Sequence, residues 1–361
     1  MVAKLPQAEK TNIKDWPFHD LVLEDVSSPT LCNTGIHPMG NQIILIDGTI
    51  VHNTAPKNIK VEVGGLGELM PIPNLLIYSN GTKRNSRLVI IVPKDTVVNE
   101  PLSIIVVAKE RSLVHKTEVV LESGASLDLV ENYIGIGNFN ANILSTFEIE
   151  TNVNLTVKTV SDMPADTVVY HHKHVQMKND SSIDTTNFII NGANMVFEDF
   201  THLIGRGAEA DVKTVAIASD EQKQNITVRV MNIAEASAGN ITNYGIVKDN
   251  AHLVFNGIGK IQKAAKASDN QQETRLLNLS KTAEAIANPF LLIDEGDITA
   301  GHAASIGQLD EEQVYYLMSR GMSREEAGKM IVSGFLAPFV ESLNDEIMND
   351  VLVAKIEDKL G

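Results

Sequence analysis

Short stretches in which apolar and polar residues alternate dominate the chain from about residue 41 to about residue 263. They are rich in Val, Ile and Thr, as at 42–51, 88–92, 103–108 and 225–231. This alternation predicts strands, and the Gly, Asn, Asp and Ser residues between the stretches predict turns. Because long helical periodicity is hard to find in this region, the pattern predicts a mainly β fold.

The spacing of these strands predicts the architecture. A turn followed by an apolar step returns every 27 or 28 residues, and weaker strand starts fall about midway. The strong positions are Leu127, Leu155, Ile183 and Ala210, and the weaker ones lie near Ile143, Val169, Val196 and Ile226. Evenly spaced short strands without helices between them bury their faces by coiling into a solenoid. We therefore expect a β-helix, with a β-sandwich as the alternative that spacing alone leaves open.

The pattern changes near residue 286, and helices are predicted after it. Asp310 is placed to cap a helix that starts at the next residue, and Gly321 is placed to end that helix. We therefore expect three parts. They are an N-terminal segment over 1–40, the β-helix core over 41–285 and a helical C-terminal domain over 286–361.

Two further helices are predicted in the C-terminal domain. Ser323 and Glu326 form a capping box, the usual start of a helix, and Pro338 is expected to interrupt that second helix. Apolar residues at steps of four predict a third helix from Phe339 towards Leu360. Three short amphipathic helices would form a compact module.

The charge balance argues against a nucleic-acid partner. The chain carries 46 acidic and 30 basic residues, a net charge of -16 at pH 7, which is the wrong sign for neutralising phosphates. No apolar run approaches the roughly 20 residues of a membrane-spanning helix. The first residues also lack the apolar stretch of a secretory signal. We expect a cytoplasmic protein that binds neither nucleic acid nor membrane.

Motifs for catalysis are missing from the sequence. The glycines at 257–260 lack the first glycine and the final hydroxyl of a phosphate loop, and no Gly-x-Ser-x-Gly elbow occurs. A solenoid enzyme acting on carbohydrate stays open as an alternative, although an aromatic content of 5% is low for a sugar-binding cleft. Its candidate acids, whose spacing fits solvated turns better, are Asp162, Asp166, Asp180 and Asp184.

Candidate metal ligands are few. Cys32 is the only cysteine, so a cluster or zinc site built from this chain's thiolates alone is excluded. His172 and His174 fall on one face of a predicted strand, within reach of one metal ion, which leaves a histidine-dependent metalloprotein open. A polar or interface stripe is the simpler interpretation of this pair. His302 lies in the small-residue segment 297–307, which is expected to join the solenoid to the helices.

Motifs over about the last 110 residues resemble the SufB/SufD family of iron-sulfur cluster assembly proteins. The segments that carry the resemblance are 254–261, 267–272, 275–280, 301–313 and 315–321. The form His-Ala-Ala-Ser-Ile-Gly-Gln-Leu-Asp from His302 is similar to the SufD type, and the single cysteine agrees, since SufB-type subunits carry cysteines that accept sulfur. Many SufD-type proteins have Cys-Ser-His where this chain has Ala300-Gly301-His302, so the histidine is matched and the thiol is not.

The resemblance implies a right-handed parallel β-helix that acts as a scaffold of the SUF system and is not itself an enzyme. It implies pairing with a SufB-like paralogue and docking of a SufC-like ABC-type ATPase on the C-terminal helices. An exposed solenoid edge would also allow a homodimer in isolation. No cofactor is expected to stay tightly bound, whereas iron or an iron-sulfur cluster would pass transiently at the SufB interface, with His302 as a shared ligand.

The expected partner contacts lie on the C-terminal helices, because their aromatic and apolar residues exceed what three short helices bury among themselves. Aromatic side chains are favoured interface anchors. Packing against the end of the solenoid is the alternative role for each of these residues. The residues are Tyr315, Tyr316, Leu317, Arg320, Gly321, Phe335, Leu336 and Phe339.

Overall fold

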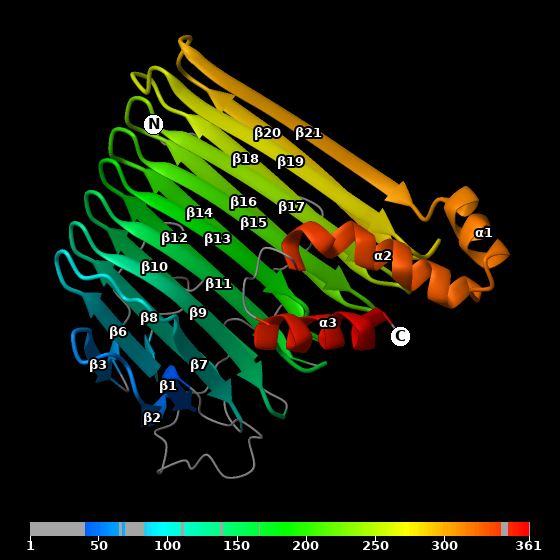
Figure 1. Ribbon diagram of the computed structural model, residues 1–361, viewed down its shortest axis with the longest axis horizontal. Coiled ribbons are helices and arrows are strands. Elements are labelled where there is room, and N and C mark those ends of the chain that lie inside the picture. The colour runs from blue at the N-terminus through cyan, green and yellow to red at the C-terminus, as the bar shows by residue number, and fades with distance from the viewer. Residues whose placement is uncertain are drawn as a thin grey trace.

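The computed structural model shows a solenoid of β-strands followed by helices (Figure 1). It describes residues 40–64, 67–68, 83–84, 86–109, 112–137, 140–165, 167–340 and 346–360. The N-terminal segment predicted over 1–40 lies outside the described residues except for its last position, and so do Cys32 and Asp166. The described strands coil into about 8 turns, which confirms the predicted mainly β, parallel solenoid.

Two long sheets form the walls of the solenoid, and each turn contributes one strand to each sheet. Sheet A has the order β2 (Thr49–Asn53), β1 (Asn41–Ile46), β7 (Leu102–Ala108), β9 (Ser126–Gly135), β11 (Asn154–Asp162), β13 (Ser182–Ile189), β15 (Glu209–Ala218), β17 (Ala238–Val247), β19 (Ser268–Asn278) and β21 (Ile298–Gln308). Sheet B has the order β20 (Glu284–Ile293), β18 (His252–Ile261), β16 (Lys223–Asn232), β14 (Asn194–Leu203), β12 (Val168–Met177), β10 (Asn140–Ile149), β8 (Leu113–Leu121), β6 (Ser86–Val92) and β3 (Lys60–Gly64). A separate short pair joins β4 (Gly67–Glu68) to β5 (Lys83–Arg84).

The strand register explains the repeat in the sequence. Leu155 of β11 lies beside Leu127 on one side and Ile183 on the other, and Ile183 lies beside Ala210. All four are buried between the sheets. One interval is therefore one turn of the solenoid, with apolar residues stacked at the strand spacing of about 4.8 Å. The midway positions belong to sheet B. There Ile143 pairs with His171 and not with Val169, so the predicted positions lie in the right strands but do not all pair with one another.

The interior also holds a buried ion pair. Lys173 of β12 and Glu131 of β9 meet across the core, with Nζ 3.8 Å from Oε2 and both side chains 0% exposed. Lys173 donates to Thr159 Oγ1 at 2.9 Å and to Asn187 Oδ1 at 3.1 Å, and Tyr133 donates to Glu131 Oε1 at 3.0 Å. A buried ion pair is tolerated only when the other polar atoms of both side chains have hydrogen-bond partners. These contacts provide such partners for Lys173 and Glu131.

The solenoid continues past the boundary expected at residue 286. β20 and β21 add a further turn that reaches Gln308, and the helices begin at Glu311. Most of β21 is exposed and built from small or polar residues, and Ile306 is 52% exposed. Because no later turn covers this strand in the described structure, it needs no alternating apolar face. Its sequence therefore resembles a connecting segment.

The first helix begins and ends as predicted. Asp310 caps α1 (Glu311–Ser319), because its Oδ1 accepts a hydrogen bond from the Glu312 N–H at 2.9 Å. Gly321 follows the helix with a φ of 100°, a left-handed conformation that glycine adopts without steric cost. An N-cap of this kind stabilises a helix by about 1 kcal/mol.

The second helix starts as predicted but ends later. Ser323 and Glu326 make both bonds of the capping box at the start of α2 (Arg324–Val340), with donor–acceptor distances of 3.2 and 2.7 Å. The expectation that Pro338 interrupts this helix is wrong, because the helix runs on for two residues beyond it. Phe339 is 3% exposed and packs in a cluster with sheet A, so tertiary burial outweighs the lost backbone bond.

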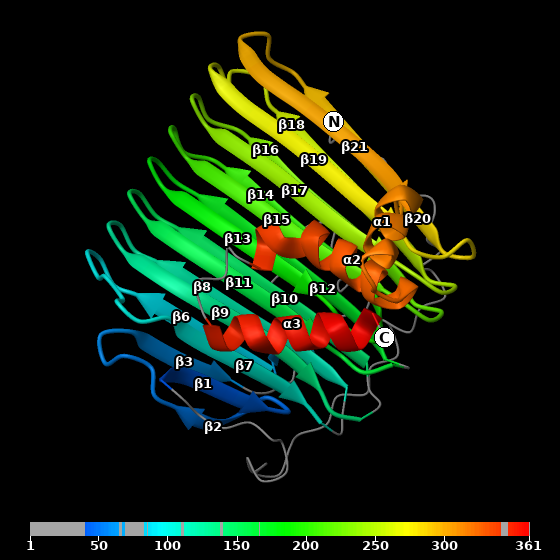
Figure 2. The same ribbon diagram turned by 45° about the vertical axis from the view of Figure 1, so that its right-hand side comes forward.

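α2 lies across the outer face of sheet A (Figure 2). Tyr244 of β17 stacks on Phe335 with ring centroids 4.9 Å apart and meets Phe339 edge-on at 4.6 Å. Leu336, 1% exposed, joins the same cluster. The helical part is therefore fixed to the side of the solenoid through aromatic and aliphatic burial.

α3 (Glu346–Leu360) begins later than predicted and is fixed to the solenoid by its lysines. Lys359 Nζ donates to the Asn191 carbonyl and to Gln222 Oε1, both at 2.6 Å, and Lys355 pairs with Asp162. Burial lowers the pKa of Lys359 to about 8. Among the described residues, no helix combines the length and the hydropathy that crossing a bilayer requires.

Candidate functional site

The last turn of the solenoid exposes two edge strands, β20 and β21, which we call the open end (Figure 1). His302 lies within β21, in register with Gln272 of β19, and not in the connecting segment where the sequence placed it. Gln272 donates from Nε2 to the Phe290 carbonyl of β20 at 2.8 Å, so its side chain crosses the interior between the sheets. Register partners share a face, which puts the exposed His302 on the inner face of the open end.

His302 can offer a metal ion one nitrogen lone pair, since its other ring nitrogen carries a proton in the neutral form. Ala300 and Gly301, which precede it, bring no side-chain ligand. Within the described ranges no group of three or more His, Cys, Asp and Glu side chains could hold a metal ion. A metal ion at His302 therefore needs ligands from another molecule.

His172 and His174 share the outer face of β12, as the sequence predicted. Their rings stack with centroids 6.2 Å apart, and His172 Nδ1 lies 2.9 Å from Glu198 Oε2. The ring of His174 meets His202 edge-on at 4.9 Å, and burial lowers their pKa values to about 4 and about 3. His171, between the two, is buried in the core. In the described structure these histidines do not make a three-ligand metal group.

The predicted partner contacts divide into two sets, and the first is accessible on and beside α1. Tyr315 and Tyr316 are 75% and 56% exposed, Arg320 and Gly321 are exposed, and Leu317 is half-buried. A hollow of about 410 Å³ lies beside them. Its lining residues are Asp310, Glu312, Gln313, Tyr316, Leu317 and Ile331.

The second set packs on the solenoid. Leu336 and Phe339 are buried and Phe335 is half-buried, all three in the cluster with the outer face of sheet A. In the structure these three residues have the alternative role, because they pack against the solenoid. They contact the side of the solenoid and not its end. Sequence reasoning could not separate the two sets, because an aromatic residue on a short helix serves either role.

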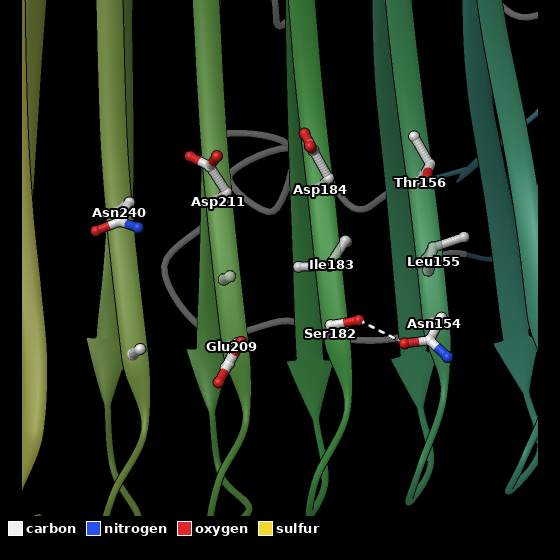
Figure 3. A pocket seen from close by; sticks show the side chains of 11 residues that line it. Asn154, Leu155, Thr156, Ser182, Ile183, Asp184, Glu209, Asp211 and Asn240 are labelled. Atoms are coloured by element: carbon white, nitrogen blue, oxygen red, sulfur yellow. Dashed lines mark hydrogen bonds between the residues drawn. The ribbon is translucent and has the colours of Figure 1, made fainter. Parts of the chain in front are cut away.

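A polar pocket of about 290 Å³ lies on the outer face of sheet A (Figure 3). Lys213 donates to both carboxylate oxygens of Asp184 at 3.0 Å and lies 2.8 Å from Asp211 Oδ2, so both acids are paired. No aromatic side chain lines the pocket. Asp162 pairs with a lysine of α3, and Asp180 lies at a turn with a φ of 54°. Of the three candidate acids that the structure describes, only Asp184 lines this pocket, so the described residues do not support the carbohydrate interpretation.

Comparisons with known proteins agree with the motifs at the C-terminal end. The chain matches a family model described as SUF system FeS cluster assembly, SufBD core domain, over residues 104–335. The Bacillus subtilis iron-sulfur cluster assembly protein SufD is 38% identical over 275 residues, which cover 74% of this chain and 63% of that protein. The Escherichia coli protein of the same name is 24% identical over 242 residues, 66% of this chain and 57% of that protein.

The alignments span less than two thirds of the length of either relative. The family model nevertheless covers more than half of this chain, including the strands β8 to β21 and the first two thirds of α2. The resemblance predicted from the segments around His302 is confirmed. The chain belongs to the SufB/SufD family and is of the SufD type.

Proposed function

We propose that this chain is a non-catalytic scaffold subunit of a cytoplasmic SUF complex, with iron and sulfide as its cargo. The observation that carries the proposal is that His302 lies on the inner face of the edge strand β21, which pairs with β19 on one side and with no described strand on the other. The Bacillus subtilis and Escherichia coli relatives are named as iron-sulfur cluster assembly proteins. A ligand at an edge that another chain can cover would hold iron while the two chains are paired and release it when they separate.

The proposed partner at the open end is a SufB-like paralogue. The unpaired N–H and C=O groups of an edge strand bind a further strand, and the open end offers one such edge in each sheet. Small residues around His302, among them Gly301 and Ala303, allow another backbone to come close. A SufB-type partner would bring the cysteines that this chain lacks, so thiolates and the His302 imidazole would meet at one interface.

The proposed partner at α1 is a SufC-like ABC-type ATPase. Tyr315 and Tyr316 are exposed aromatic residues beside a hollow, the usual character of an interface anchor. Arg324 of α2 bonds both carboxylate oxygens of Glu311 in α1, at 2.9 and 2.6 Å. Since α2 is packed on sheet A, a pull on α1 would reach the solenoid. ATP-driven association of two ATPase subunits would then strain the paired scaffolds and open their shared interface.

Anaerobic purification of the tagged chain from its own cells tests the proposed partners. We expect size-exclusion chromatography and mass spectrometry to identify a SufC-like ATPase and a SufB-like paralogue in one complex. Cells that lack the paralogue should yield a homodimer. Recovery of the chain alone, from cells that express both partners, would refute the docking proposal.

The substitution His302→Ala tests the proposed iron ligand. We expect the complex to assemble but to lose most of its iron and its capacity to form a cluster. Ser305→Ala, on the same strand and on its outer face, is the matched control and should keep both. A His302→Ala complex that forms clusters as the wild type does would rule out this ligand.

A further inference from the structure

Buried amide oxygens without a hydrogen-bond donor lie in the two turns below the open end. They belong to Asn243 of β17 and to Asn270 and Gln272 of β19, which are 0%, 0% and 5% exposed. The orientation of the Gln272 amide is settled, because its nitrogen donates to the Phe290 carbonyl. Buried acceptors normally have a donor, so an unpaired one points to a donor that this conformation of the chain does not engage.

Glycines on the opposite wall hold the Gln272 amide in place. A Cβ atom at Gly257 would lie 2.8 Å from Gln272 Oε1, and one at Gly259 would lie 2.6 Å from Gln272 Nε2. Any other residue at these positions would displace the amide. The chain therefore holds this amide on β19, the strand beside that of His302, and neighbouring strands lie about 4.8 Å apart.

We propose that Gln272 is the positioning residue of His302: its Oε1 accepts the ring N–H of His302 and leaves the other ring nitrogen free for iron. This inference rests on the iron role proposed above for His302. A ligating histidine commonly gives its second N–H to a carbonyl or carboxylate, which fixes its tautomer and ring orientation. Among the described residues no hydrogen bond holds the His302 ring, and Gln272 Oε1 has no donor. The register of β19 and β21 places these two residues side by side.

Co²⁺ is a suitable probe, because its absorption spectrum reports its ligands and Co²⁺ can stand in for Fe²⁺. We would titrate Co²⁺ into the purified anaerobic complex with its paired family member, for the wild type and for His302→Ala, Gln272→Leu and Gln272→Glu. Gln271→Leu is the matched control, because its side chain lies on the outer face and donates to Asp269 at 2.6 Å. Circular dichroism and thermal melting would confirm that each variant is folded.

We expect Gln272→Leu to weaken the His302-dependent Co²⁺ binding by about 10- to 100-fold and to change its spectrum, as loss of the hydrogen-bond partner of a metal-binding histidine does. Gln272→Glu keeps an acceptor and should bind Co²⁺ at least as tightly as the wild type, and Gln271→Leu should behave as the wild type. Unchanged affinity and spectrum in Gln272→Leu would overturn the inference. If that variant does not fold, weak binding by Gln272→Glu would overturn it.

The same titration separates this inference from the proposed iron site. If His302→Ala binds Co²⁺ as the wild type does, then His302 is not a ligand and the iron role fails, whatever Gln272 does. If His302→Ala loses binding while Gln272→Leu retains it, the iron role stands and only the positioning role of Gln272 fails.

Discussion

The two ends of the solenoid differ in the direction of their last strands. At the N-terminal end β2 and β3 run antiparallel to β1 and β6, and β2 folds back over β1 through a turn at Asp47 and Gly48 with positive φ angles. At the open end β20 and β21 run parallel to their neighbours, as every strand in between does. A further parallel turn would continue the open end directly, whereas the reversed strands interrupt the repeat. The proposed pairing therefore belongs at the open end, where a further parallel strand would continue the repeat.

Two regions of the interior differ as well. In the middle of the solenoid the core contains the Lys173–Glu131 pair, and the chain itself supplies hydrogen bonds to both charges. Toward the open end the core contains glycines and amide oxygens that have no donor. The charged pair is therefore satisfied within one chain, whereas these amide oxygens are not.

Breaking the buried pair should have the largest effect. Lys173→Met leaves Glu131 buried without its partner, which should lower the free energy of unfolding by about 3–5 kcal/mol. Urea unfolding followed by circular dichroism measures this. The double variant Lys173→Met with Glu131→Met should recover most of the loss, because neither charge then remains. Equal stability of the single and double variants would contradict this account.

Charges placed on the open end should have the next largest effect. Ala303→Lys with Ser305→Lys puts two ammonium groups on the outer face of β21, and we expect pairing with the partner to weaken about 100-fold, near 3 kcal/mol. Size-exclusion chromatography with light scattering measures the pairing. The same pair of lysines at Thr49 and Asn53, exposed on β2, should change nothing. Loss of pairing from the β2 variant would reverse our assignment of the two ends.

The region near the N-terminal end should also be sensitive to pH. His115 is buried, with its ring nitrogens 2.6 and 2.7 Å from the hydroxyls of Ser86 and Thr117, and burial lowers its pKa to about 3. In the unfolded chain the pKa of His115 has its usual value of about 6.5. The contribution of the buried neutral ring to the free energy of unfolding is therefore complete above about pH 6.5 and declines as the pH falls toward 3. At pH 5.5 the loss should be about 1 kcal/mol.

Urea unfolding at pH 7.5 and pH 5.5 measures this dependence. His115→Asn should be less stable at pH 7.5 but should lose less stability between the two pH values than the wild type does. An identical pH dependence in the variant would show that the loss comes from other groups, of which His171 is the nearest candidate, since burial lowers its pKa as well.

The smallest effect should come from the helices beside the open end. Ser323→Ala removes the capping box of α2 and should cost about 1 kcal/mol. Hydrogen exchange should show faster exchange in the first turn of α2 and unchanged exchange in the solenoid. Ser333→Ala, exposed in the middle of the same helix, is the control. Faster exchange throughout the solenoid would mean that helix and solenoid unfold together.

Much of this fold could be predicted because the local pattern coincides with the final structure. The 27- or 28-residue interval is one turn, since Leu127, Leu155 and Ile183 stack in register. The capping residues Asp310 and Ser323 act within their own helices, so their roles need no distant contacts.

Other features depend on contacts that no local pattern contains. The last turn was not predicted, because the exposed β21 lacks the apolar alternation of a covered strand. Phe339 extends α2 beyond Pro338 only because Tyr244 lies beneath it, and Tyr244 is distant in the sequence. In the candidate site, the resemblance identified His302, whereas Gln272 could be recognised only once the register placed it beside that histidine.

The reversed strands at the N-terminal end also bear on stoichiometry. A repeat with two free ends of the same kind grows into an open filament when each copy stacks on the next. In the described structure only one end, that of β20 and β21, continues the parallel repeat. When two such solenoids join end to end, neither has a second parallel end for a third. If solenoids pair end to end as proposed, the hairpin of β1 and β2 would therefore limit this stacking to two solenoids.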